Sequence, residues 1–291
     1  MIVRIEDSMA VAQPYREPTV YEATATGMPH LRPYLVDLWE RRRFIWHLAR
    51  TDLKGEHYDS AIGQIWVILD PLLMAAVYFL LRTVVRPAGS GAARNLVLAH
   101  LVWSIFFFTF VSNSMTTGAR SVLAGRNLIL NASFPRAVLP IVSIVKAVFD
   151  FVPTMLVYFA FHAVLRQPFG LALFTLPIVI VTLTLMNVGL ALLFAPLMVF
   201  FRDTGGFLPY INRVWLYITP ALYFIKEIPP NLLAYLRWNP LFPAYAALEQ
   251  IFSAHFPSRG YLLASLAWAV GFFLLGAIVF LARERDFAVR L

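Results

Sequence analysis

The sequence predicts an all-α integral membrane protein, and three observations point to this fold class. Sixty per cent of its 291 residues are hydrophobic and only 14% are charged, against about 25% charged residues in soluble domains. The apolar residues are gathered in runs long enough to cross a bilayer, which takes about 20 residues in a helix. Helices are required because backbone polar groups find no water inside the hydrocarbon.

The apolar runs predict six transmembrane helices and, by the flanking charges, their orientation. With both termini in the cytoplasm, 15 Lys and Arg fall on the inside and seven on the outside, which agrees with the positive-inside rule. An even number of spans also puts both termini on one side. The sequence divides into a polar tail (1–32), an amphipathic helix (33–56) and a six-helix domain (57–291), with spans at 63–85, 95–117, 138–165, 171–201, 207–225 and 261–282.

Residues 33–56 combine an apolar face with many arginines, and their tryptophans Trp39 and Trp46 suit a membrane–water interface. Leu38, Ile45 and Ala49 belong to the apolar face. This pattern is typical of a helix that lies on the membrane surface rather than across it. A cytoplasmic helix packed on a partner protein is the alternative interpretation.

The segment before the last span, 226–260, contains five prolines and two apolar pieces that are too short to cross a bilayer. It predicts short re-entrant helices that dip into the outer leaflet. Irregular backbone at that depth must be buried in protein or line a wet cavity.

Several kinds of chemistry are absent from the sequence. A phosphate-binding loop ends in Gly-Lys-Ser/Thr, and none of the three lysines follows a glycine. There is no cysteine, so thiolate metal sites are excluded. The basic residues sit at the ends of apolar spans, which favours a membrane over nucleic acid. We therefore expect no catalytic, cofactor or metal site in this chain.

Ionisable residues within the spans are candidates for function, because they are costly in lipid. Lys146 and Asp150 are four residues apart and share one helix face. They could relay ions in a secondary transporter, or form a neutral pair inside the bundle. Asp70 precedes Pro71 near the start of the first span. It could face a wet entrance or bond to backbone groups that the proline frees.

Three sequence motifs follow one another along the chain. The first is RTDLKGEHYDSAIGQIWVILDPL at 50–72, which includes Asp52, Lys54, Tyr58 and Trp66. The second is GRNLILNASFPRAVLP at 125–140. The third is ITPALYF at 218–224, followed by WNPLFP at 238–243. Together they resemble the permeases of type-2 ABC transporters that export O-antigen, teichoic acid or galactan, and the resemblance covers the chain from about residue 35 to the end.

This resemblance implies a homodimer in the bacterial cytoplasmic membrane, with two separate ATPase subunits that bind ATP and Mg²⁺. The substrate would be an undecaprenyl-linked polysaccharide, and membrane lipid would surround the complex. Residues 118–136 would then form the coupling helix that docks on the ATPase. Leu123, Leu128 and Ile129 are expected to be exposed there, and the coupling residues are Arg120, Leu123, Arg126, Asn127, Leu128 and Ile129.

Aromatic and basic residues provide the other candidate sites. Aromatic rings offer an apolar face to sugars and, in Tyr and Trp, a polar group, although lipid-facing aromatics are the ordinary alternative. The basic residues of the amphipathic helix could hold a pyrophosphate or attract anionic lipid in general. The pathway candidates are Tyr78, Trp103, Phe106, Tyr217, Tyr223 and Phe224, and the entrance candidates are Arg42, Arg50, Lys54 and Tyr58.

Three other functions compete with polysaccharide export. The same fold serves type-2 ABC permeases for drugs or lipids. An ion-coupled secondary transporter would use Lys146 and Asp150. A membrane enzyme acting on polyprenyl lipids would have only His57, Asp59 and Asp70 as candidate catalytic residues.

Overall fold

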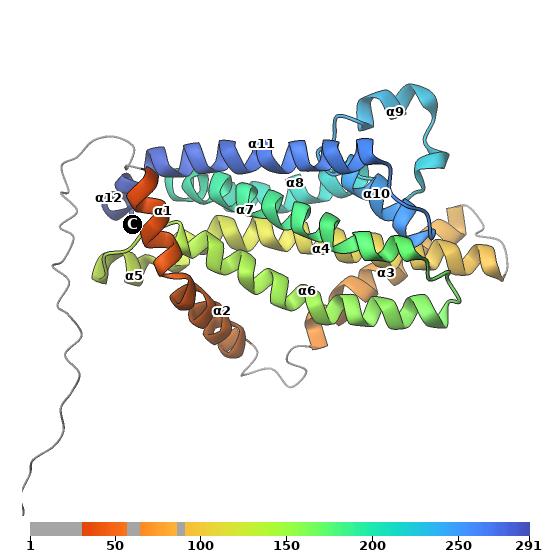
Figure 1. The fold of residues 1–291 in the computed structure, drawn as a ribbon, viewed down its shortest axis with the longest axis horizontal. Coiled ribbons are helices and arrows are strands. Elements are labelled where there is room, and N and C mark those ends of the chain that lie inside the picture. The colour runs from red at the N-terminus through yellow and green to blue at the C-terminus, as the bar shows by residue number, and fades with distance from the viewer. Residues whose placement is uncertain (1–30, 57–64, 86–90) are drawn as a thin grey trace, which may run out of the picture.

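The computed structural model describes residues 31–56, 65–85 and 91–291, and within these ranges every regular element is a helix. Most helices run along one common axis (Figure 1). The short helices α1 (Leu31–Glu40), α5 (Arg126–Asn131) and α12 (Phe287–Arg290) lie at one end of the bundle with the C-terminus. Helix α9 (Pro230–Leu236) lies at the opposite end.

Helix α4 (Ala92–Ala124) is the centre of the bundle. In its most apolar stretch 72% of the residues are buried, against 11% in α3 (Ile65–Val85), so α3 lies on the outside. The neighbours of α4 are α3, α6 (Val138–Val164) and α7 (Leu176–Phe200), and α7 packs in turn on α11 (Arg259–Arg283). A helix that is apolar all round must be buried or face lipid, and both cases occur here.

Small residues allow the central helices to approach closely. A Cβ added at Gly276 of α11 would collide with the carbonyl oxygen of Gly189 in α7. A Cβ added at Gly118 of α4 would collide with Ala191 of α7. Close backbone contact through small residues is the usual way in which helices associate in lipid, where the hydrophobic effect does not drive them together.

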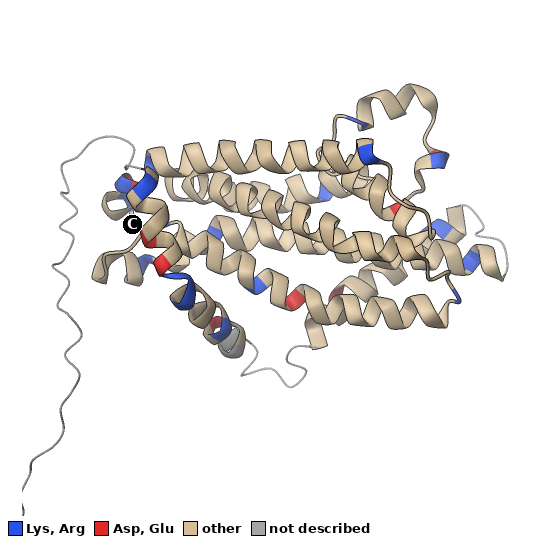
Figure 2. Cartoon of the chain, in the orientation of Figure 1, with Lys and Arg blue, Asp and Glu red and all other residues tan. Residues whose placement is uncertain are grey.

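Five helical stretches in the described residues are long and apolar enough to cross a membrane, and they overlap five of the six predicted spans, although the second continues to Asn131, well past the predicted end at 117. Figure 2 shows that most charged residues lie toward the two ends of the bundle. A long, nearly uncharged middle section is what a bilayer requires. The five stretches are Ile65–Val85, Ala92–Asn131, Val138–Val164, Leu171–Phe200 and Arg259–Arg290.

The predicted fifth span, 207–225, is only partly helical. Helix α8 (Thr204–Ile218) has 15 residues, or roughly 22 Å at 1.5 Å per residue, which is shorter than about 30 Å of hydrocarbon. Thr219 is extended because the following Pro220 disfavours helical backbone in the residue before it. Three short helices then lead to α11: η2 (Ile225–Glu227), α9 and α10 (Phe242–Phe252).

The predicted amphipathic helix 33–56 consists of two helices, α1 and α2 (Arg42–Glu56), with a turn at Arg41. Tyr34 of α1 lies with the buried residues near Ile129, whereas Leu38 of α1 packs together with α2 on α6. Hydrogen bonds from Arg41 to Asp37 and from Ile45 to Arg41 continue the helical pattern through the turn. The remaining short elements are η1 (Leu171–Thr175) and η3 (Glu284–Asp286).

Candidate coupling segment and transport pathway

Helix α5 follows α4 after one residue, Gly125, at the end of the bundle that also holds α1 and α12 (Figure 1). A Cβ at Gly125 would lie 2.5 Å from Leu139 Cδ1, so glycine lets the chain pass close to the start of α6. Hydrogen bonds from Gly125 to Ser121 and from Ile129 to Gly125 continue the helical pattern across this residue, and Ile129 packs α5 against the end of the bundle.

The predicted coupling residues divide into exposed and anchoring groups. Arg120, Arg126 and Asn127 are exposed, and Leu128 is 37% exposed. The expectation that Ile129 and Leu123 are exposed is wrong: Ile129 is only 7% exposed, and Leu123 is half-buried against the same cluster. A short helix on the end of a bundle must turn one face inward, and these two side chains provide it.

The loop from α5 to α6 is fastened by three separate elements. The backbone N–H of Arg136 donates to Glu284 Oε1 at 2.8 Å, and its guanidinium donates to the carbonyl oxygen of Glu284. Tyr34 accepts a hydrogen bond from the Ala137 N–H at 3.3 Å. Arg41 reaches the carbonyl oxygen of Ser133 at 3.4 Å. The segment is thus tied to α1 and to the C-terminal end of α11.

The entrance candidates that the structure describes lie on α2. Arg42 and Arg50 are exposed, and the guanidinium of Arg42 lies 5.2 Å from the ring centroid of Trp39. On the other face Ile45 and Ala49 are buried against α6. Two further candidates, the side chain of Lys54 and Tyr58, lie outside the described residues, as do His57 and Asp59.

Three of the six pathway candidates form one group between α3 and α8. The rings of Tyr78 and Tyr217 lie 6.5 Å apart, edge to face. Tyr223 donates its hydroxyl proton to the carbonyl oxygen of Tyr217 at 3.2 Å. Tyr217 is 52% exposed, so this group reaches the surface of the bundle.

The other three pathway candidates are buried. Trp103 is 3% exposed and packs 5.3 Å from Phe252. Phe224 lies 4.2 Å from the ring of His100. Phe106 is 1% exposed and lines a hollow between α3, α4 and α6. These three rings therefore pack inside the chain.

The intramembrane charges of α6 face that same hollow. Lys146 and Asp150 are half-buried and both line a cavity of about 180 Å³. Asp70 is exposed on α3 and does not line it. Asp150 also lines a second hollow, beside α2, so this residue lies where the two spaces meet.

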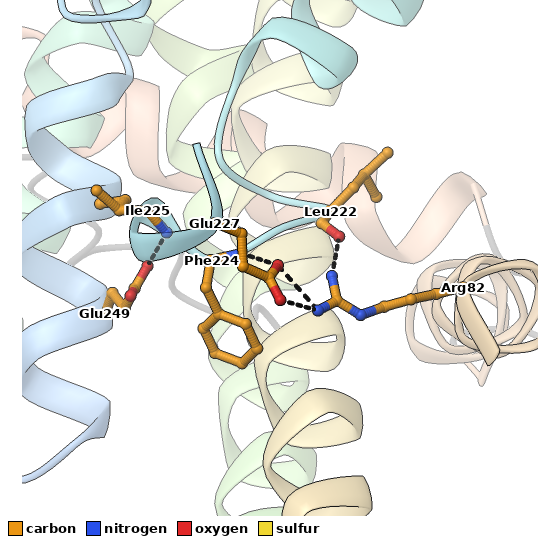
Figure 3. A network of polar contacts seen from close by, with 6 residues as sticks. All are labelled: Arg82, Leu222, Phe224, Ile225, Glu227 and Glu249. Atoms are coloured by element: carbon orange, nitrogen blue, oxygen red, sulfur yellow. Dashed lines mark hydrogen bonds and ion pairs between the residues drawn. The ribbon is translucent and has the colours of Figure 1, made fainter. Parts of the chain in front are cut away.

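An ion pair at the opposite end of the bundle holds the segment between α8 and α9, as Figure 3 shows. Arg82 of α3 contacts both carboxylate oxygens of Glu227, at 2.8 and 2.9 Å, and donates to the carbonyl oxygen of Leu222 at 3.0 Å. The Phe224 N–H donates to Glu227 as well, at 3.1 Å. Both charges are largely shielded from solvent, which makes the loss of either partner costly.

Glu249 of α10 completes this network by accepting a hydrogen bond from the Ile225 N–H at 3.1 Å (Figure 3). Burial raises the pKa of the Glu249 carboxyl, while the Ile225 N–H and the Lys226 charge lower it and the Glu227 charge raises it. Desolvation is the largest of these effects.

Asn239 supports the end of α8. Its side-chain oxygen accepts from Trp215 Nε1 at 2.8 Å and from the Leu241 N–H at 3.1 Å. Its amide donates to the carbonyl oxygen of Ile218 at 3.0 Å and to Thr219 Oγ1 at 2.9 Å. The side-chain amide of Asn239 thus has partners for its oxygen and its nitrogen. It binds a carbonyl oxygen at the end of α8, where Pro220 prevents the helix from continuing.

Sequence reasoning did not single out Arg82, Glu227, Glu249 or Asn239. For Asn239 a signal existed, since it belongs to the WNPLFP motif. The pairing of Arg82 with Glu227 joins residues 145 positions apart, and one sequence contains no sign of such a contact.

Comparison with known proteins identifies the family. The family model described as ABC-2 type transporter matches residues 44–253, which include α3 to α10. The chain is 27% identical over 245 residues to the O-antigen export system permease protein RfbA of Klebsiella pneumoniae, covering 83% of this chain and 92% of that protein.

A second O-antigen export system permease protein RfbA, from Myxococcus xanthus, is 27% identical over 265 residues. The alignment covers 87% of this chain and 96% of that protein. The family model matches most of the chain. It leaves out α1, α11 and α12. The chain is therefore a membrane-embedded transport subunit that belongs to the ABC-2 type transporter family.

Proposed function

We propose that this chain is the permease subunit of an ATP-driven exporter of lipid-linked polysaccharide, of the O-antigen, teichoic-acid or galactan class. The observation that carries the proposal is its similarity, over most of its length, to O-antigen export permeases. In this proposal the chain crosses the bacterial cytoplasmic membrane six times, with α8 and the segment up to α9 as the fifth crossing. Both termini are cytoplasmic.

The motor of the proposed exporter is a separate ATPase that docks on α5. Arg120, Arg126, Asn127 and Leu128 supply an exposed, basic contact surface. Ile129 is buried in the bundle, so a displacement of α5 would be passed to the helices that surround it. Two copies of the ATPase would serve two copies of this chain, with ATP and Mg²⁺ bound on the ATPase.

The polymer would pass between two copies of this chain. Tyr78, Tyr217 and Tyr223 form a surface group between α3 and α8, and α3 is the least buried of the candidate spans. Tyrosine rings hold sugar C–H surfaces without fixing one sugar in place. Arg42 and Arg50 on α2 would attract the pyrophosphate of the undecaprenyl-linked substrate.

Transport by the purified complex tests the proposal. The chain is reconstituted in liposomes with its ATPase on the outside. A fluorescent lipid-linked glycan is placed in the outer leaflet, on the same side as the ATPase. ATP should move the glycan to the opposite leaflet, whereas a non-hydrolysable ATP analogue should not. An ATPase with its P-loop lysine replaced by alanine is the control. Glycan transport driven by a proton gradient without ATP would contradict the proposal and support ion coupling.

A further inference from the structure

Two neighbouring hollows lie beside the surface helix α2 and between the helices next to it, and both are open, since Arg50 lines the first and Asn113 and Thr117 line the second as exposed residues. The outer hollow has a volume of about 600 Å³ and lies between α2, α3 and α6, with Trp46, Arg50 and Phe149 in its wall. The inner hollow, of about 180 Å³, lies between α3, α4 and α6. Val67 and Asp150 line both, so the two spaces adjoin at these residues.

The inner hollow is polar, although it lies among apolar helices. Asn113 and the Lys146–Asp150 pair supply donors and acceptors, and the one cation and one anion leave no net charge. The hydroxyl groups in its wall come from Thr109, Thr117, Ser143 and Thr154. Those of Thr117, Ser143 and Thr154 donate to backbone carbonyl oxygens of their own helices, and a hydroxyl oxygen that donates its proton can still accept a hydrogen bond from a ligand.

Aromatic rings form an apolar wall of the same hollow. Phe110 of α4 and Phe151 of α6 are stacked with centroids 4.4 Å apart and planes 22° from parallel, and Phe106 lies beside them in the lining. A wall of rings facing hydroxyl, amide and charged groups suits a ligand with an apolar face and a rim of hydroxyls. A sugar ring has this chemistry.

We propose that the inner hollow binds one uncharged sugar unit, and that the sugar reaches it through the outer hollow. The inference rests on the proposed function, and it assigns the two ends of a lipid-linked glycan to two places. Arg50 in the wall of the outer hollow, near the surface, suits a phosphate. In the inner hollow the charges of Lys146 and Asp150 cancel, which suits an uncharged ring. At about 180 Å³ the inner hollow is smaller than pockets for drug-sized ligands, which occupy about 300 Å³ or more, so it holds a single unit.

Photolabelling of the full chain in phosphatidylcholine nanodiscs tests the site. The probe is octyl glucoside with a diazirine on its sugar ring, and octyl phosphate is the competitor for comparison. Mass spectrometry should find saturable labels in peptides that contain 109–117 and 143–154. Asn113→Leu and Thr109→Val should each weaken labelling about tenfold, as expected for the loss of one or two hydrogen bonds.

Two controls keep the test decisive. Asn231→Leu changes an exposed asparagine on α9 and should leave labelling unchanged. Thr109→Val preserves side-chain shape, and its unfolding temperature should stay close to that of the unchanged protein. Absence of saturable glucoside labelling at these peptides, or stronger competition by octyl phosphate than by unlabelled octyl glucoside, overturns the inference.

The outcome is separable from that of the proposed function. If the reconstituted complex transports glycan but the inner hollow takes no glucoside label, the sugar site is wrong and the exporter stands. If the hollow is labelled as expected but ATP drives no glycan transport, the exporter is wrong and the sugar site stands on its own.

Discussion

At the scale of single residues, neighbours in α5 have opposite roles. Leu128 is 37% exposed and Ile129 is 7% exposed, although both are large aliphatic residues in the same six-residue helix. The sequence pointed to this segment, but a helix this short has too few turns to reveal which face is buried. Which face of α5 is buried depends on its contacts with residues far away in the sequence, at the end of the bundle.

The exposed face of α5 gives the first prediction. Arg126→Glu and Leu128→Asp should each abolish co-purification of the ATPase and leave the unfolding temperature unchanged, because neither side chain is buried. Ile129→Ala should instead destabilise the bundle by about 2–5 kcal/mol, as buried isoleucine truncations do. Affinity purification with quantitative immunoblotting measures the first effect, and thermal unfolding measures the second.

A matched control for these variants lies at the other end of the bundle. Leu232→Asp places the same charge at a leucine of α9 that is 50% exposed, and it should retain the ATPase fully. Recovery of the ATPase at unchanged yield with both α5 variants would show that α5 is not the docking surface.

At the scale of elements, the sequence predicts helices well and their interruptions poorly. Runs of apolar residues define the long helices because lipid leaves the backbone no alternative. The end of α8 at Ile218 follows from Pro220, and Asn239 stabilises it from 21 residues further along the chain. Hydropathy alone reports neither a proline nor a side-chain contact, so it predicts an unbroken span there.

The crossing of α7 and α11 gives the second prediction. Gly276→Ala should lower the unfolding temperature, because its Cβ would collide with the backbone carbonyl of Gly189. Overpacking of this kind costs typically about 1–3 kcal/mol. Gly271→Ala in the same helix is the control, since no atom lies within 4 Å of the added Cβ. It should be neutral or stabilising by up to about 1 kcal/mol. Thermal unfolding by tryptophan fluorescence distinguishes them, and equal stability of both variants would mean that the helices do not approach through these glycines.

At the scale of the whole molecule, the two ends of the bundle are chemically different. One end combines α5 with the arginines of α2 and the C-terminal segment, while the other holds the Arg82–Glu227 network and α9. Charge counting in the loops predicts the first end to be cytoplasmic. This orientation can be tested by labelling one position at each end.

The sequence contains no cysteine, so a thiol-reactive label reacts only with a cysteine that is introduced. A single cysteine is introduced at Asn127 in α5 or at Asn231 in α9, both exposed positions at opposite ends of the bundle (Figure 1). A membrane-impermeant maleimide should label Asn231→Cys in intact cells, or in spheroplasts where an outer membrane blocks the reagent, and Asn127→Cys only after permeabilisation. Labelling of Asn127→Cys from outside would place α5 on the wrong face for an ATPase, because ATP is hydrolysed in the cytoplasm, and the proposed exporter would then be untenable.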